Sequence, residues 1–110
     1  MYDQKDIYAL EFVAEMLDEI SSSVRRHGSV ISALSDFESK NSILMNLIQI
    51  GEKLNSLRSE ELRNVLPAKE AYSVRNRITH DYGGIDLEIV ESIIVHDLPG
   101  LKDKILSLLV

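Results

Sequence analysis

A long, mostly apolar segment lies in the middle of the chain, where residues 43–57 read ILMNLIQIGEKLNSL. Its large aliphatic residues recur at spacings of three and four, which is the period of a helix face. The apolar face is broad, so we predict a central helix that other helices contact on more than one side. We expect Ser39 or Asn41 to cap its start. Gly51 inside this helix costs about 1 kcal/mol relative to alanine, which indicates close approach by a neighbouring helix.

A second long helix is predicted before this segment. Its apolar stripe comprises Leu10, Val13, Leu17, Ile20 and Val24. We expect it to start near Asp3 or Asp6 and to stop at residues 25–28, where cationic side chains meet the exposed carbonyls and Gly28 supplies a left-handed cap. A short helical stretch is expected around residues 30–37.

Shorter helices are predicted in the second half of the chain. One begins at residues 59–62 and is interrupted by Pro67, which cannot donate a backbone hydrogen bond. Another runs over residues 68–82 and is ended by the two glycines that follow. The next is expected over residues 86–94, capped by its first residue, and the Pro-Gly pair at 99–100 should separate it from a short C-terminal helix.

Composition supports an all-α fold in one domain. The chain has 110 residues, 45% of them hydrophobic, with five Gly, two Pro and no Cys. We therefore predict an antiparallel bundle of four or five helices that spans residues 1–110 as a single domain. The lack of cysteine excludes disulfide scaffolds, thiol nucleophiles and cysteine zinc sites. No apolar run could span a bilayer, and the polar N-terminus does not resemble a cleavable signal peptide, so we expect a cytoplasmic protein away from membranes.

Charge is distributed unevenly. The net charge of −6 and the pI near 5.0 argue against indiscriminate binding to nucleic acids, and DNA is not an expected partner. Residues 51–80, however, hold six basic against four acidic residues, whereas both flanking segments are acidic. A bound anion is therefore expected in this middle block.

Residues 71–82, AYSVRNRITHDY, place polar side chains on one helix face. At about 100° per residue, the opposite, buried face comprises Ala71, Val74, Ile78 and Tyr82. Asn76 and His80 point away from the core and, four residues apart, can meet. Arg75 lies at the boundary, where its stem can pack while its head reaches the polar face. Tyr82 falls near the core edge; either its ring packs with the hydroxyl emerging, or the helix ends first and the glycine turn re-aims it, which we favour.

The pair Arg75 and His80 can support a limited chemistry. Histidine acts as a general base or acid near neutral pH, and arginine binds phosphate with two hydrogen bonds. One His and one Arg without a carboxylate cluster suit metal-independent RNA cleavage that activates the ribose 2′-OH and leaves a 2′,3′-cyclic phosphate. A second copy of the chain would help to provide the acid for the leaving group. The alternative is a solvated helix end that only keeps the bundle soluble.

The spacing Arg75-Asn76, three residues, His80, one residue, Tyr82 resembles the R-N-x-x-x-H-x-Y motif of the HEPN superfamily, and in particular its HepT-like toxins. The glycine-containing exit after Tyr82 strengthens the likeness. Residues 50–54, IGEKL, resemble the Gly-Glu element of that family's central helix, and residues 97–99, DLP, resemble its C-terminal turn. The likeness covers essentially the whole chain.

The resemblance implies roles for individual residues. Arg75 and His80 match the catalytic pair of a metal-independent endoribonuclease, and Asn76 matches the adjacent polar member of the motif. Tyr82 matches the tyrosine that a cognate minimal nucleotidyltransferase (MNT) antitoxin modifies with AMP, which silences the toxin. A type II toxin–antitoxin system, an RNA substrate (tRNA or mRNA) and a homodimer with both motifs facing a shared cleft are likewise implied.

Other readings remain open at this point. The chain could be a non-catalytic subunit that binds nucleotide or partner for a nucleotidyltransferase, or a purely structural bundle. His27 and His96 are interpreted as helix-end residues. No His-x-x-x-His spacing and no carboxylates paired near a histidine occur, so neither a metal site nor another cofactor is expected.

Overall fold

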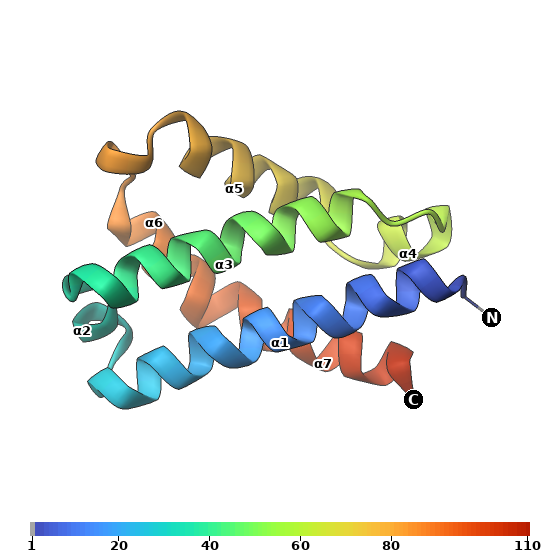
Figure 1. The fold of residues 1–110 in the computed structure, drawn as a ribbon, viewed down its shortest axis with the longest axis horizontal. Helices are drawn as coiled ribbons and strands as arrows, with labels where there is room; N and C mark the ends of the chain where they lie inside the picture. Colours follow the sequence, from blue (N-terminus) through green and yellow to red (C-terminus); the bar gives the residue numbers. More distant parts are fainter. Residues whose placement is uncertain (1) are drawn as a thin grey trace.

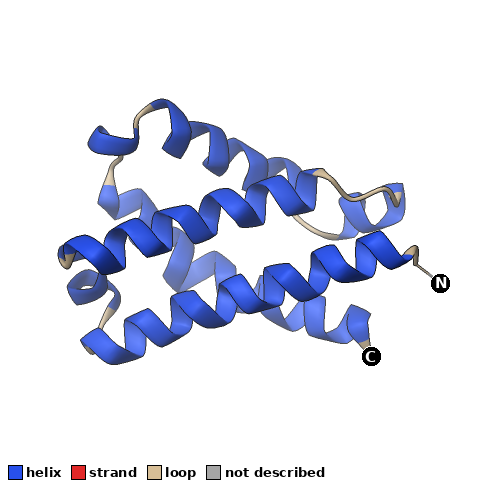
Figure 2. Cartoon of the chain, in the orientation of Figure 1, coloured by secondary structure: helices blue, strands red, loops and turns tan. Residues whose placement is uncertain are grey.

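Every secondary-structure element of residues 2–110, the part of the chain that this computed structural model describes, is helical (Figure 2). The longer helices are α1 (Gln4–His27), α3 (Phe37–Asn55), α5 (Ala68–His80) and α7 (Leu98–Leu109). The shorter elements are α2 (Val30–Ser35), α4 (Glu60–Val65), the 3₁₀ turn η1 (Tyr82–Gly84), α6 (Leu87–Ser92) and the π-helical turn η2 (Ile93–Asp97). The predicted all-α bundle is confirmed, and no helix of the described part is long and apolar enough to cross a membrane.

Helix α3 is the centre of the bundle. It lies between α1 and α5 and runs antiparallel to both, while α6, η2 and α7 pass behind in one continuous run (Figure 1). Helix α7 packs against α1, and α2 contacts both α1 and α3. The apolar side chains that α1 and α3 contribute to the core are buried, among them Leu10, Val13, Leu17, Ile20, Ile43, Leu44, Leu47, Ile50 and Leu54. The central position predicted for residues 43–57 is therefore confirmed.

The helix ends show ordinary capping interactions, and one cap differs from the residue that the sequence predicts. Helix α1 ends at Gly28, whose φ of 86° is the left-handed cap that the sequence predicts. Helix α3 begins earlier than expected, because Asp36 and neither Ser39 nor Asn41 is its N-cap. The Asp36 carboxylate accepts a hydrogen bond from the Ser39 backbone N–H at 2.9 Å. An acidic cap also stabilises the positive end of the helix dipole.

The prediction that Pro99 and Gly100 separate two helices is wrong. Both lie in the first turn of α7, and η2 joins that helix directly to α6. The Leu98 N–H bonds to the carbonyl of Ile93, five residues back. A proline ring normally clashes with the carbonyl four residues before it and has no N–H to donate. The wider turn just before Pro99 accommodates the ring, so the chain continues without a break.

Gly51 sets the spacing between α3 and α5. A Cβ at this position would lie 2.6 Å from the Ala71 carbonyl oxygen and 2.7 Å from Arg75 Cβ, both on α5. These distances are far inside van der Waals contact, and one of the two atoms belongs to the backbone. The close helix approach that the central glycine indicates in the sequence is therefore confirmed.

We expect Gly51→Ala to lower the free energy of unfolding by about 1–3 kcal/mol, because the helices must separate or shift to admit the methyl group. Urea denaturation of the purified protein measures the loss. The matched control is Gly100→Ala in α7, where an added Cβ meets nothing within 4 Å. That variant should be neutral or more stable by up to about 1 kcal/mol. Equal stability of Gly51→Ala and the unsubstituted protein would contradict the close approach.

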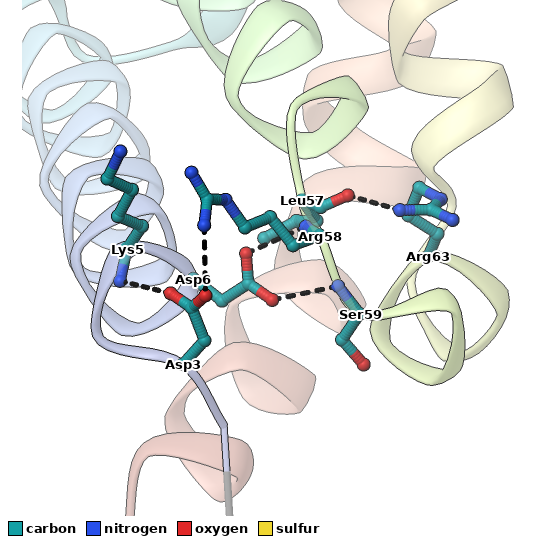
Figure 3. A network of polar contacts seen from close by, with 7 residues as sticks. All are labelled: Asp3, Lys5, Asp6, Leu57, Arg58, Ser59 and Arg63. Atoms are coloured by element: carbon teal, nitrogen blue, oxygen red, sulfur yellow. Dashed lines mark hydrogen bonds and ion pairs between the residues drawn. The ribbon is translucent and has the colours of Figure 1, made fainter.

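A buried carboxylate ties α1 to the loop before α4. Asp6, 2% exposed, accepts hydrogen bonds from the backbone N–H groups of Arg58 at 2.8 Å and Ser59 at 2.9 Å (Figure 3). The neighbouring Asp3 caps α1 through Lys5 N and contacts the Arg58 guanidinium at 3.5 Å. Arg63 donates to the Leu57 carbonyl in the same loop. Asp6 therefore satisfies two backbone donors of the loop between α3 and α4.

Asp6→Ala should reduce the free energy of unfolding by about 2–4 kcal/mol, because both donors lose an ionised acceptor in a buried place. Asp6→Asn retains one acceptor oxygen and should lose less. The control Asp3→Ala removes an exposed helix cap and a long, exposed contact with Arg58, and should cost about 0.5–2 kcal/mol. Thermal and urea unfolding rank the three variants. A loss for Asp6→Ala no larger than that for Asp3→Ala would show that the buried contact contributes little.

Candidate active site

Helix α5 carries three of the sequence-predicted site residues, Arg75, Asn76 and His80. Ile78 is buried and Ala71 and Val74 are partly buried against the core, as the helix period predicts. Arg75 and Asn76 are half-buried at the boundary, and His80 is exposed at the last position of the helix. Arg75, Asn76 and His80 thus all lie on α5, with Arg75 and Asn76 at the boundary with α3 and His80 exposed at the end of the helix.

The Arg75 side chain, 28% exposed, is held from three directions. One guanidinium nitrogen donates to Asn76 Oδ1 at 3.0 Å, and the other lies 3.4 Å from Glu52 Oε2 on α3. The guanidinium carbon lies 5.5 Å from the centre of the Tyr72 ring, within cation–π range. Nε is buried and has no hydrogen-bond partner among the described residues. The cation is therefore pre-oriented at the α3–α5 boundary, with its terminal nitrogens toward the surface.

Glu52 is a partner whose part in the site the helix pattern alone does not reveal. Because Gly51 lets α5 approach closely, the next residue on α3 reaches the Arg75 guanidinium. The distance between the Arg75 guanidinium nitrogen and Glu52 Oε2, 3.4 Å, is long for an ion pair, and Glu52 is 45% exposed. The ion pair therefore contributes little to the stability of the fold, about 0–1 kcal/mol. An anion that offers two oxygens to the guanidinium can compete with a carboxylate held this loosely.

Asn76 and His80 do not form the side-chain pair that their spacing permits. The Asn76 side chain instead accepts the hydrogen bond from Arg75, and its backbone carbonyl accepts one from the Thr79 hydroxyl at 3.1 Å. His80 remains on the exposed end of the helix. Asn76 therefore orients the arginine, and the imidazole of His80 faces the solvent.

Tyr82 lies beyond the end of α5. The helix stops at His80, Asp81 has non-helical backbone angles (φ −141°, ψ 54°), and Tyr82 opens η1. Tyr82 is 38% exposed, and its hydroxyl donates to Asn41 Oδ1 at 3.0 Å. The sequence left two alternatives for Tyr82: a ring packed at the end of the helix, or a helix that ends before Tyr82. The second alternative is confirmed. Sequence reasoning assigns Asn41 only as a possible helix cap, since a residue 41 positions away leaves no local signal.

A family model described as "Ribonuclease HepT-like" matches residues 9–108. The chain belongs to the HepT-like ribonuclease family. Comparison with curated proteins and with solved structures gives no match. The resemblance read from residues 75–82 is confirmed at the level of the family, and nuclease activity on RNA is what this membership supports in general.

In this HepT-like ribonuclease the other two histidines lie on other elements than Arg75, His27 at the end of α1 and His96 in η2. His27 Nδ1 is 2.8 Å from the Ser23 carbonyl and Nε2 is 3.7 Å from Asp36, which agrees with a helix-end role. His96 is exposed in η2 and, with Glu70, lines a cavity of about 580 Å³ between α5 and α7. Over residues 2–110 no group of three or more His, Asp or Glu is arranged to hold a metal ion.

Proposed function

We propose that this HepT-like protein is a metal-independent endoribonuclease with Arg75 and His80 as its catalytic residues. The observation that carries the proposal is the presence on α5 of an oriented, half-buried arginine and, five residues later, an exposed histidine, in a chain of a ribonuclease family. The arginine can bind the scissile phosphate, and the histidine is free to exchange a proton with the substrate.

In the proposed reaction His80 accepts the proton of the ribose 2′-OH. The 2′-oxygen then attacks the adjacent phosphorus, the bond from phosphorus to the 5′-oxygen breaks, and that oxygen takes a proton from an acid as it leaves. Arg75 stabilises the negative charge on the non-bridging oxygens, and Asn76 keeps the guanidinium oriented. The products are a 2′,3′-cyclic phosphate and a 5′-hydroxyl.

The leaving-group acid is best supplied by His80 of a second copy in a homodimer. Each chain has His27 near Asp36 and His96 in η2, so His80 is the histidine that lies on the Arg75 helix. A symmetric pair with both α5 faces toward one groove would also double the basic residues of the 51–80 block. That addition matters because the net charge of one chain, −6, weakens attraction to an RNA backbone.

Regulation by AMPylation at Tyr82 completes the proposal, with an MNT-type antitoxin in the cytoplasm as the partner. The Tyr82 hydroxyl oxygen would attack the α-phosphorus of ATP, pyrophosphate would leave, and the phenolic proton would pass to solvent or to a base of the transferase. The added phosphate and nucleoside would lie two residues from His80. They would obstruct the groove by size and occupy Arg75 by charge.

A non-catalytic subunit that binds a nucleotide or a nucleotidyltransferase is the second candidate. The acidic net charge favours it, since tight RNA binding ordinarily requires several cationic contacts with phosphates. Under this reading Tyr82 is still modified, and His80 serves binding only.

Substitution of His80 distinguishes the two candidates. We expect the unsubstituted protein to cut total tRNA or a defined mRNA in the presence of EDTA, and His80→Ala to reduce the rate by about 10²–10⁴-fold, because the general base is lost. The matched control is His96→Ala, which removes another exposed histidine and should leave the rate unchanged. Analysis of the product ends should find cyclic phosphate.

Two other results would be informative. Cleavage that persists in His80→Ala at the original rate would contradict the catalytic assignment. No cleavage by unsubstituted protein, after mass spectrometry has shown that Tyr82 carries no AMP, would favour the binding subunit.

A further inference from the structure

The Tyr82 hydroxyl contacts a residue for which neither the helix pattern nor the family motif predicts a role in the site. It donates to Asn41 Oδ1 at 3.0 Å and lies 3.4 Å from the backbone carbonyl oxygen of the same residue. Asn41 is on the second turn of α3, partly buried and 41 positions away in sequence. Both acceptors are oxygens, so the contact requires the phenolic proton.

This hydrogen bond holds a segment that has few other supports. Residues 81–84, the exit turn, are all exposed, and a Cβ added at Gly83 would meet nothing within 4 Å. Within the turn, the Gly84 N–H donates to the Asp81 carbonyl at 3.1 Å. Among the described residues, the hydrogen bonds that join the exit turn to α3 all come from the Tyr82 hydroxyl. Asn41 therefore provides the hydrogen-bonded support of the turn on α3, in addition to the bond from the Asp81 N–H to the Arg77 carbonyl of α5.

The direction of the bond also orients the phenolic oxygen. Since its proton is donated to Asn41, the oxygen keeps its lone pairs for another partner, and Tyr82 is 38% exposed. An electrophilic phosphorus that approaches from solvent would meet these lone pairs. Once the oxygen is esterified, no proton is left, and two or more oxygens would oppose each other across the former contact.

We propose that Asn41 is a positioning residue for Tyr82: it presents the hydroxyl oxygen to the modifying enzyme and anchors the exit turn to α3 only while that hydroxyl is free. Esterification of Tyr82 then releases the turn that directly follows His80. The role as acceptor for a modified tyrosine rests on the proposed AMPylation, whereas the anchoring role depends only on the free hydroxyl.

Hydrogen–deuterium exchange of the full chain tests the anchoring role. Asn41→Leu and Tyr82→Phe should each raise exchange of the backbone amides at 82–85 by roughly two- to tenfold, which is the effect of losing one hydrogen bond. The double variant should exchange no faster than either single one, because both remove the same contact. O-methyltyrosine at position 82, which keeps the oxygen and lacks the proton, should behave like Tyr82→Phe.

Matched controls separate positioning from general loss of structure. Ser42→Ala removes an exposed polar side chain next to Asn41, and Tyr8→Phe removes the hydroxyl of another exposed tyrosine; neither should alter exchange at 82–85. Asn41→Asp keeps an acceptor oxygen and should restore the exchange of the unsubstituted protein. Amides of α1 serve as the internal reference and should stay unchanged throughout.

Several outcomes would overturn the proposal. These are unchanged exchange at 82–85 in Asn41→Leu, additive effects in the double variant, or faster exchange in α1 to the same degree as in the turn. Because exchange is measured without RNA or transferase, its result is independent of the cleavage assay with His80→Ala. Failure of the ribonuclease assignment and failure of the anchoring role can therefore be told apart.

Discussion

The close contact between α3 and α5 at Gly51 is the constraint on which the candidate site depends. No Cβ fits between Gly51 and the backbone of α5, so the two helices meet at a distance that only glycine permits. That distance brings Glu52 within reach of Arg75 and leaves the guanidinium at the helix boundary. A wider separation would move the arginine away from its α3 partner and allow it more conformations. The conformational cost of orienting the cation is therefore met during folding and not during substrate binding.

The environment of Arg75 combines firm orientation with a weak charge partner. Asn76 and Tyr72 fix the plane of the guanidinium from its own helix, and Glu52 offers only a long contact on the exposed side. A buried ion pair in the same place would resist exchange for a phosphate, because separating it would leave an unpaired charge. A half-exposed pair can be replaced by an incoming anion at little cost. This arrangement suits an arginine that binds and releases phosphate groups.

Tyr82 and Asn41 link the motif to a second element of the fold. The motif residues lie within a short stretch of α5 and its exit, so their order is local, whereas the partner of the tyrosine comes from the start of α3. The position of the hydroxyl thus depends on how α3 packs, and the exit turn depends on the chemical state of one oxygen. A modification at Tyr82 would in this way change both the charge beside His80 and the support of the turn that follows it.

The sequence by itself determined the all-α class, the central position of residues 43–57, the outward face with His80 and the boundary place of Arg75, because helix periodicity is a local property that side-chain order encodes directly. It also indicated Gly51 as a point of close approach and showed the resemblance to the HepT-like family that the family model confirms. The sequence-based predictions of the start of α3 and of a helix break at Pro99 were wrong. Asp36 is the N-cap in place of Ser39 or Asn41, and the wider π-helical turn before Pro99 leaves room for the proline ring. Only the tertiary structure decided which residues far apart in sequence meet: Glu52 with Arg75, Asn41 with Tyr82 and Asp6 with the loop at 58–59. Such contacts depend on the rotation and separation of packed helices, so they cannot be predicted from the spacing of residues along the chain.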